Sequence, residues 1–194
     1  MEKISYALGL SLGNNLLNSG ITNLNFAKLL NGIQDVMEQN KPELSYDEAQ
    51  TVINDYFQEL QSEAGEGAQK EGNKFLEANA KRPEVVTLSS GLQYEILTEG
   101  NGAIPKASDK VKVHYHGTLI DGNVFDSSVN RGEPATFGVT QVIAGWVEAL
   151  QLMTVGSKWK LCIPSDLAYG AQGAGKQIGP HTTLVFEVEL LAIV

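Results

Sequence analysis

The sequence contains few of the residues on which several classes of protein depend. Cys162 is the single cysteine among 194 residues, so no disulfide scaffold within the chain can support the fold. The chain has only 14 Lys and Arg against 23 Asp and Glu, a net charge of -9, which argues against nucleic acid or an anionic membrane surface as partner. No apolar run approaches the ~20 residues that a membrane-spanning helix needs, so we expect no membrane partner.

The N-terminal segment also lacks the pattern of a secretory signal peptide. Polar residues and glycines interrupt the apolar residues between Met1 and Leu17, and no cationic region leads into a compact apolar stretch. We therefore expect a cytoplasmic protein. The alternative is a periplasmic or cell-envelope protein from which a leader has been removed.

Composition divides the chain near Pro83. Before it, apolar residues recur at helical spacing; after it come both tryptophans, most of the glycines and short alternating runs rich in Val, Ile, Thr and aromatic residues. We predict an α+β protein. An all-helical module over residues 1–84, which includes a long connecting helix, is expected to precede a β-rich domain over residues 85–194.

Three helices are expected in the first part. Apolar residues recur every four positions from Ile4 to Leu16, and a second stripe runs from Phe26 to Met37. A capping box, Ser45 with Glu48 three residues later, begins a third helix that would reach residue 81 and measure about 50 Å at ~1.5 Å per residue. A bundle within one chain is one interpretation of these stripes. Because so few aromatics make a marginal core, we favour a homodimer through residues 1–60.

The second part is typical of an antiparallel sheet. Residues 110–116 alternate between apolar and polar side chains, Asp121 and Gly122 form a hairpin-type turn signal, and residues 158–163 and 182–194 alternate again. A short helix fits residues 145–153. These patterns predict a strongly twisted antiparallel sheet wrapped around one short helix.

Motifs for hydrolytic, metal or nucleotide chemistry find little support. His114 and His116 share a strand face with lysines and are best explained as solvated polar positions, Cys162 as a structural thiol, and His181 as a turn residue. The run from Gly170 to Gln177 matches a phosphate-binding loop until its last position, where Gln replaces the required Ser or Thr. We expect no cofactor and no metal.

The remaining chemistry-bearing residues are mostly aromatic and aliphatic. Such a set is typical of a domain core, but Asp126 and the polar ends of Tyr and Trp side chains favour a concave apolar pocket for a small ligand or peptide. The candidate pocket residues are Tyr115, Phe125, Asp126, Phe137, Val142, Ile143, Trp146, Tyr169 and Phe186.

Six blocks of the second part form a recognisable set. They are Val113-His-Tyr115-His-Gly117-Thr-Leu119, Asp121-Gly-Asn-Val-Phe125-Asp126-Ser-Ser128, Val142-Ile143-Ala-Gly145-Trp146, Met153-Thr-Val-Gly156, Ala168-Tyr169-Gly170 and Leu184-Val-Phe186-Glu-Val188-Glu-Leu190. Together they resemble one known family, the FKBP-type peptidyl-prolyl cis-trans isomerases, which bind macrolides such as rapamycin, and the resemblance spans about residues 88–192. The first part, with Ala7-Leu8-Gly9 and Phe75-Leu76-Glu-Ala-Asn79-Ala, is similar to the helical dimerisation module of the macrophage infectivity potentiator branch.

The resemblance implies a role for each candidate residue. Trp146 would form the pocket floor, Ile143 would donate its backbone N–H to the ligand, and Arg131 would hold Asp126. The catalytic set implied is Tyr115, Phe125, Asp126, Trp146, Tyr169 and Phe186. The substrate-binding set implied is Phe137, Val142, Ile143, Ile178 and Arg131. The chain departs from common family residues at Ala135, often aromatic, and at Gly179, often proline.

The implied activity is rotation of X–Pro bonds in unfolded or partly folded polypeptides, with macrolides as inhibitors. Rotation of an amide breaks no covalent bond, so it needs neither a nucleophile nor a metal. The alternative function is a chaperone or adaptor that binds proline-containing or unfolded segments without catalysis.

Overall fold

The computed structural model describes all 194 residues, which form two compact units, residues 1–60 and 61–194. The second half of the longest helix therefore belongs to the same unit as the sheet, whereas sequence composition changes only near Pro83. None of the helices combines the length and apolar character of a membrane span. The helices are α1 Glu2–Asn18, α2 Phe26–Glu38, α3 Tyr46–Asn79, α4 Ser128–Arg131 and α5 Ala144–Leu150.

Residues 1–60 form α1, α2 and the first half of α3, as predicted. Asn25 caps α2 by accepting a hydrogen bond from the Lys28 N–H at 3.1 Å. The predicted capping box starts α3: the Ser45 N–H donates to the Glu48 carboxylate at 2.9 Å, and the Glu48 N–H donates to Ser45 Oγ at 3.2 Å. Neither α1 nor α2 buries a single residue. Local hydrogen bonds therefore define these helices, while their apolar faces stay uncovered.

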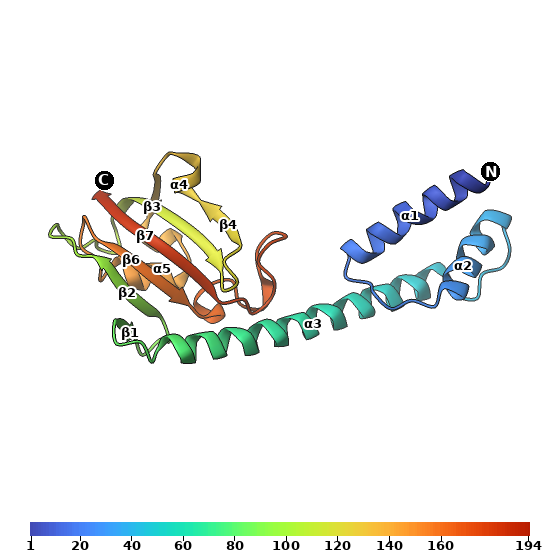
Figure 1. Cartoon of the computed structure of the whole chain (residues 1–194), viewed down its shortest axis with the longest axis horizontal. Helices are drawn as coiled ribbons and strands as arrows, with labels where there is room; N and C mark the ends of the chain where they lie inside the picture. Colours follow the sequence, from blue (N-terminus) through green and yellow to red (C-terminus); the bar gives the residue numbers. More distant parts are fainter. The chain divides into compact units, whose positions relative to one another are not determined.

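Residues 61–194 contain the predicted twisted antiparallel sheet (Figure 1). The strand order is β1-β2-β6-β7-β3-β4, and β5 pairs with β3. Because β7 lies between β6 and β3, the last strand in sequence is a central strand of the sheet. The strands are β1 Val85–Thr87, β2 Gln93–Thr98, β3 Lys110–Leu119, β4 Val124–Ser127, β5 Ala135–Gly138, β6 Lys158–Ile163 and β7 Leu184–Ile193.

The core lies between the inward face of the sheet and α5. Alternation along β3 buries Val111, Val113 and Tyr115, and α5 presents Trp146 and Leu150 to the same core. Gly145 lets α5 approach the sheet closely, because a Cβ there would lie 2.6 Å from Cγ2 of Ile163 on β6. The short predicted helix therefore packs directly on the strands, in the place where the pocket forms.

A buried polar cluster fixes the end of α3 to the outer side of the sheet. The Asn79 side-chain amide donates to Gln93 Oε1 at 2.8 Å and to Cys162 Sγ at 3.5 Å, while the Gln93 amide donates to the Leu76 carbonyl at 2.9 Å. Arg82 donates to Asn79 Oδ1 at 3.1 Å. Because buried polar groups left unpaired are costly, this cluster favours one register of α3 on β2 and β6.

Cys162 gives a direct test of this packing. Burial raises the pKa of its thiol to about 11, so the reactive thiolate is scarce near neutral pH. We expect an aromatic disulfide reagent at pH 8 to modify the native chain at least about tenfold more slowly than the urea-unfolded chain, since only the thiolate attacks. Asn79→Ala should speed native labelling by loosening the end of α3. Equal rates for folded and unfolded wild-type chains would contradict this packing.

Candidate active site

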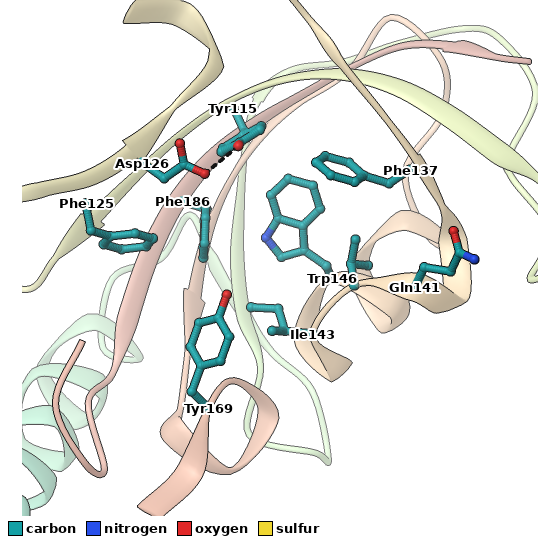
Figure 2. A pocket seen from close by; sticks show the side chains of 10 residues that line it. Tyr115, Phe125, Asp126, Phe137, Gln141, Ile143, Trp146, Tyr169 and Phe186 are labelled. Carbon is teal, nitrogen blue, oxygen red and sulfur yellow. Dashed lines mark hydrogen bonds between the residues drawn. The ribbon is translucent and has the colours of Figure 1, made fainter. Parts of the chain in front are cut away.

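A pocket of about 450 Å³ opens at one side of α5 (Figure 2). Strands, the short α5 helix and the loops around them contribute its walls, so residues separated by up to 71 positions, from Tyr115 to Phe186, meet there. Nine of the predicted candidate residues line it. The lining residues are Tyr115, Phe125, Asp126, Phe137, Gln141, Val142, Ile143, Trp146, Tyr169 and Phe186.

Trp146 forms the buried floor, with only 4% of its surface exposed. Three rings meet the indole nearly edge-to-face: Tyr115 at 5.5 Å between centroids, Phe137 at 6.0 Å and Phe186 at 5.3 Å. Such geometry directs the positive edge of one ring to the negative face of another and fixes the rings relative to each other. The indole Nε1–H is buried and has no hydrogen-bond partner within the protein. The floor is thus rigid and apolar, with one free donor.

Gly117 on β3 explains how the wall rings fit together. A Cβ at this position would lie 2.7 Å from both Phe125 Cζ and Phe186 Cε1, closer than any real contact. Those two rings pack edge-to-face with centroids 5.4 Å apart. Any larger residue at position 117 would displace these two wall rings, so the glycine is required for the shape of the cavity.

A polar group borders the aromatic floor. The Tyr115 hydroxyl donates to Asp126 Oδ2 at 2.5 Å and accepts from Arg131 Nη2 at 2.7 Å, and the Arg131 Nη1 group donates to Asp126 Oδ1. Burial acts to raise the pKa of Asp126, but the hydrogen bonds from Tyr115 and Arg131 outweigh it and leave that pKa below its ordinary value. Burial raises the pKa of Tyr115, and its hydrogen bond to Asp126 raises it further. The group therefore holds a carboxylate and a neutral phenol side by side.

The short α4 helix places Arg131 in this group. Ser127 caps α4 by accepting from the Asn130 N–H at 3.1 Å, and Gly132 ends it with a φ of 76°. Arg131, in the last turn, thereby reaches back to Asp126 and lies with its Cζ 5.5 Å from the centroid of the Tyr115 ring. Arg131 does not line the pocket, and acts on it through these two neighbours.

The two strand histidines behave differently from the solvated positions that their spacing predicts. His114 Nδ1 lies 3.0 Å from Ser128 Oγ, and His116 Nδ1 lies 2.9 Å from Ser127 Oγ. Both imidazoles are half-buried. They therefore help to join β3 to the start of α4. No group of three or more His, Cys, Asp or Glu side chains is arranged to hold a metal ion.

Tyr169 lines the pocket on the side opposite Asp126 (Figure 2). It precedes a loop in which Gly170, Gly173 and Gly175 all have positive φ, and in which Ala174 and Ile178 form an isolated antiparallel bridge. Figure 2 shows its hydroxyl directed toward the space beside Ile143. The side chain is 39% exposed, which leaves the hydroxyl accessible to a ligand.

Two further residues differ from what the sequence predicts for the site. Ile178, expected to bind substrate, is 7% exposed and packs in the core cluster, outside the pocket lining. Gln141 lines the pocket but has no place among the predicted residues. Its position directly before Val142 and Ile143 is the one signal that points to it, because those neighbours were themselves candidates.

The Asp126 ion pair predicts a pH effect on stability. Since its pKa is lowered in the folded chain, Asp126 contributes stability above its unfolded pKa of ~3.9, and this is lost as pH falls through the lower folded value. The pair is half exposed, so solvent screening keeps the contribution below about 1 kcal/mol. In urea unfolding experiments, the free energy of unfolding should fall less between pH 5 and pH 2 for Asp126→Asn than for wild type.

Arg131→Ala provides the matched comparison, because it removes the cation and leaves the carboxyl. Arg131→Ala should also reduce the fall in the free energy of unfolding between pH 5 and pH 2. The reduction should be smaller than for Asp126→Asn, since the Tyr115 hydroxyl still donates to the carboxylate. If the free energy of unfolding falls equally between pH 5 and pH 2 in wild type and Asp126→Asn, this pair contributes nothing to the pH dependence.

Comparison with known proteins places the whole chain in one family. Residues 102–191 match the model of the FKBP-type peptidyl-prolyl cis-trans isomerase, and residues 1–96 match the domain amino terminal to it. The FKBP-type 22 kDa peptidyl-prolyl cis-trans isomerase of Escherichia coli is 48% identical over 97% of this chain and 93% of its own. The outer membrane protein MIP of Legionella longbeachae is 44% identical over 99% of this chain and 85% of its own.

A solved structure agrees with these sequences. The crystal structure of FkpA from Escherichia coli superimposes with a TM-score of 0.81 and 39% identity, covering 98% of this chain and 95% of that one. The enzyme names of the relatives do not favour the alternative of a purely non-catalytic adaptor. Together with the aromatic pocket, these matches show that the chain belongs to the FKBP-type peptidyl-prolyl cis-trans isomerases, enzymes that act on proline-containing polypeptides.

Proposed function

We propose that the pocket around Trp146 turns X–Pro bonds by enclosing the prolyl ring in an apolar cavity without forming a covalent bond. The observation that carries this proposal is an accessible cavity of about 450 Å³ whose floor is an indole surrounded edge-on by three rings. A prolyl ring is compact and apolar, so its burial against these faces provides binding free energy.

The chemistry of the amide explains why such a cavity accelerates rotation. Resonance gives the X–Pro bond partial double-bond character, with a barrier of about 18 to 20 kcal/mol and uncatalysed times of tens to hundreds of seconds. The planar amide is more polar than the twisted transition state, so a pocket poor in water favours the twisted state. A thousandfold acceleration needs only about 4 kcal/mol of such preference.

The polar residues would orient the substrate at the two sides of this cavity. Tyr169, on the loop side, would donate its hydroxyl to a substrate carbonyl as the bond turns, and Ile143, at the start of α5, lies beside it. Asp126 is already engaged by Tyr115 and Arg131, so its main effect would be to hold the Tyr115 ring in place. Shape and exclusion of water would then contribute more than either polar group.

Isomerisation kinetics on a set of X–Pro peptides test these roles. We expect Tyr169→Phe and Asp126→Ala each to lower kcat/KM by about three- to thirtyfold, the equivalent of one lost oriented hydrogen bond. Tyr46→Phe, at an exposed position in residues 1–60, is the control and should match wild type. Complete loss of activity in Tyr169→Phe would instead require specific proton chemistry at that hydroxyl.

We further propose that residues 1–60 pair with a second copy of the chain. The groove between α2 and the first half of α3 has a volume of about 720 Å³ and a nearly wholly apolar lining that includes Ile33, Val36 and Ile53. Leu8, Leu17 and Phe26 of the same unit are each at least 60% exposed. Exposed apolar patches of this kind mark interaction sites, and a helical unit this small buries little apolar surface of its own, so a second copy is the partner that would cover them.

Such a dimer would contain two catalytic pockets. We propose unfolded or partly folded chains as its clients, because their X–Pro bonds are accessible and populate both isomers. Macrolides, with large apolar rings, would compete for the same indole floor. The proposed clients and the proposed macrolide competition rest on the accessible cavity and on the family of the chain, whose members act on proline-containing polypeptides.

Sedimentation of the full chain tests the dimer. We expect wild type to sediment as a dimer at about 10 μM, and Ile33→Glu to sediment as a monomer because burial of an unpaired charge is strongly unfavourable. Val129→Glu, a similarly exposed apolar position in residues 61–194, should stay dimeric. The kcat/KM of Ile33→Glu on a short peptide should equal that of wild type. A monomeric wild type would contradict the proposed pairing.

A further inference from the structure

The second half of α3 contains three glycines in one continuous helix. Gly65 and Gly72 are buried, whereas a Cβ at Gly67 would meet nothing within 4 Å. Glycine is a poor helix former, so three of them within eight residues weaken a helix unless something requires their small size. Gly67 has no packing reason of this kind, and it therefore serves as an internal reference for the other two.

Gly65 and Gly72 let the helix backbone lie directly against the segment Pro180–Thr183. A Cβ at Gly65 would lie 3.1 Å from Pro180 Cβ and 3.2 Å from His181 Cδ2. A Cβ at Gly72 would lie 2.3 Å from Thr183 Oγ1 and 3.0 Å from Thr183 Cβ. All of these residues belong to the same compact unit as the pocket. The helix therefore supports this segment at two points, two turns apart.

The supported segment is attached directly to a residue that lines the pocket. The His181 N–H donates to the Gly170 carbonyl at 2.8 Å, and Gly170 follows Tyr169 in the chain. His181 holds a φ of 53°, which is uncommon for a residue with a side chain, and its Nδ1 is buried without a partner. A backbone in this state persists only where its surroundings enforce it, and α3 provides one side of those surroundings.

The helix itself is fixed to the sheet beyond these contacts. The Asn79 amide donates to Gln93 Oε1 at 2.8 Å and the Gln93 amide donates to the Leu76 carbonyl at 2.9 Å. These hydrogen bonds oppose movement of the helix end when a side chain is added at position 65 or 72. We therefore expect part of the displacement to fall on Pro180, His181 and Thr183, the residues that the added Cβ atoms would meet.

We propose that Gly65 and Gly72 of α3 are positioning residues for isomerisation, because they seat the segment Pro180–Thr183 and through it hold Tyr169 at the pocket. This inference rests on the proposed role of Tyr169 in the pocket. The path runs from Gly65 to His181, from the His181 N–H to the Gly170 carbonyl, and from Gly170 to Tyr169. The long helix is thereby a part of the catalytic unit as well as its support.

Alanine substitutions in the full chain test the proposal. Gly65→Ala should lower kcat/KM on a short X–Pro peptide by about three- to tenfold, because misplacement of a positioned group by ~1 Å can cost about a hundredfold and the shift expected here is smaller. Gly67→Ala is the matched control, with the same chemical change in the same helix. It should keep wild-type kcat/KM and raise the melting temperature, because alanine favours the helix.

A double-mutant cycle separates positioning from a general loss of stability. In a Tyr169→Phe background, Gly65→Ala should change kcat/KM by less than about twofold, because the group that it displaces has already been removed. A purely structural role for Gly65 would lower the melting temperature and leave the kcat/KM of the folded protein unchanged. An equal effect of Gly65→Ala with and without Tyr169 would likewise overturn the proposal.

Gly72→Ala brings the larger clash and needs a rescue variant. Thr183→Ala removes the Oγ1 atom that an alanine at 72 would meet, so the double variant Gly72→Ala with Thr183→Ala should regain at least about half of the activity lost in Gly72→Ala. If Gly65→Ala and Gly72→Ala have the same kcat/KM as Gly67→Ala, the positioning role is overturned and the proposed function of the pocket still stands. An inactive wild-type chain would instead contradict the proposed function of the pocket.

Discussion

The edge-to-face packing around Trp146 is the constraint on which the catalytic unit depends. Gly145 sets the depth of α5, because its missing Cβ lets the helix rest against Ile163. Gly117 sets the distance between the Phe125 and Phe186 rings. These close approaches fix the position of the Trp146 indole, and the three rings that pack edge-to-face on it are placed accordingly. The shape of the cavity therefore depends on backbone close approaches as much as on the aromatic side chains themselves.

The polar residues at the edge of the cavity have a different task from the rings. Asp126 and Arg131 are about half exposed, so their ion pair adds little to stability. Their value is geometric: both hold the Tyr115 hydroxyl, and Tyr115 in turn packs on the indole. An exposed ion pair of this kind keeps an aromatic wall in one orientation while the cavity beside it stays open to solvent.

Local patterns could be predicted from the sequence, and long-range contacts could not. The capping box at Ser45, the alternation along β3 and the helix around Trp146 follow from spacing. The pocket residues follow from their aromatic and polar character, and their individual roles from the family resemblance. Ile178 shows the limit, because an isolated bridge with Ala174 turns its side chain into the core. Gly65 and Gly72 look like weak points of a helix until Pro180 and Thr183, more than a hundred residues later, are seen against them.

The position of β7 has a consequence for synthesis at the ribosome. Leu184–Ile193 lies between β6 and β3, which emerge earlier and do not pair with each other. The nascent sheet therefore keeps a gap in its middle until this last strand has left the exit tunnel, whereas α1 and α2 need only neighbouring residues to form. An enzyme that assists the folding of other chains thus completes its own catalytic unit as a late, long-range event.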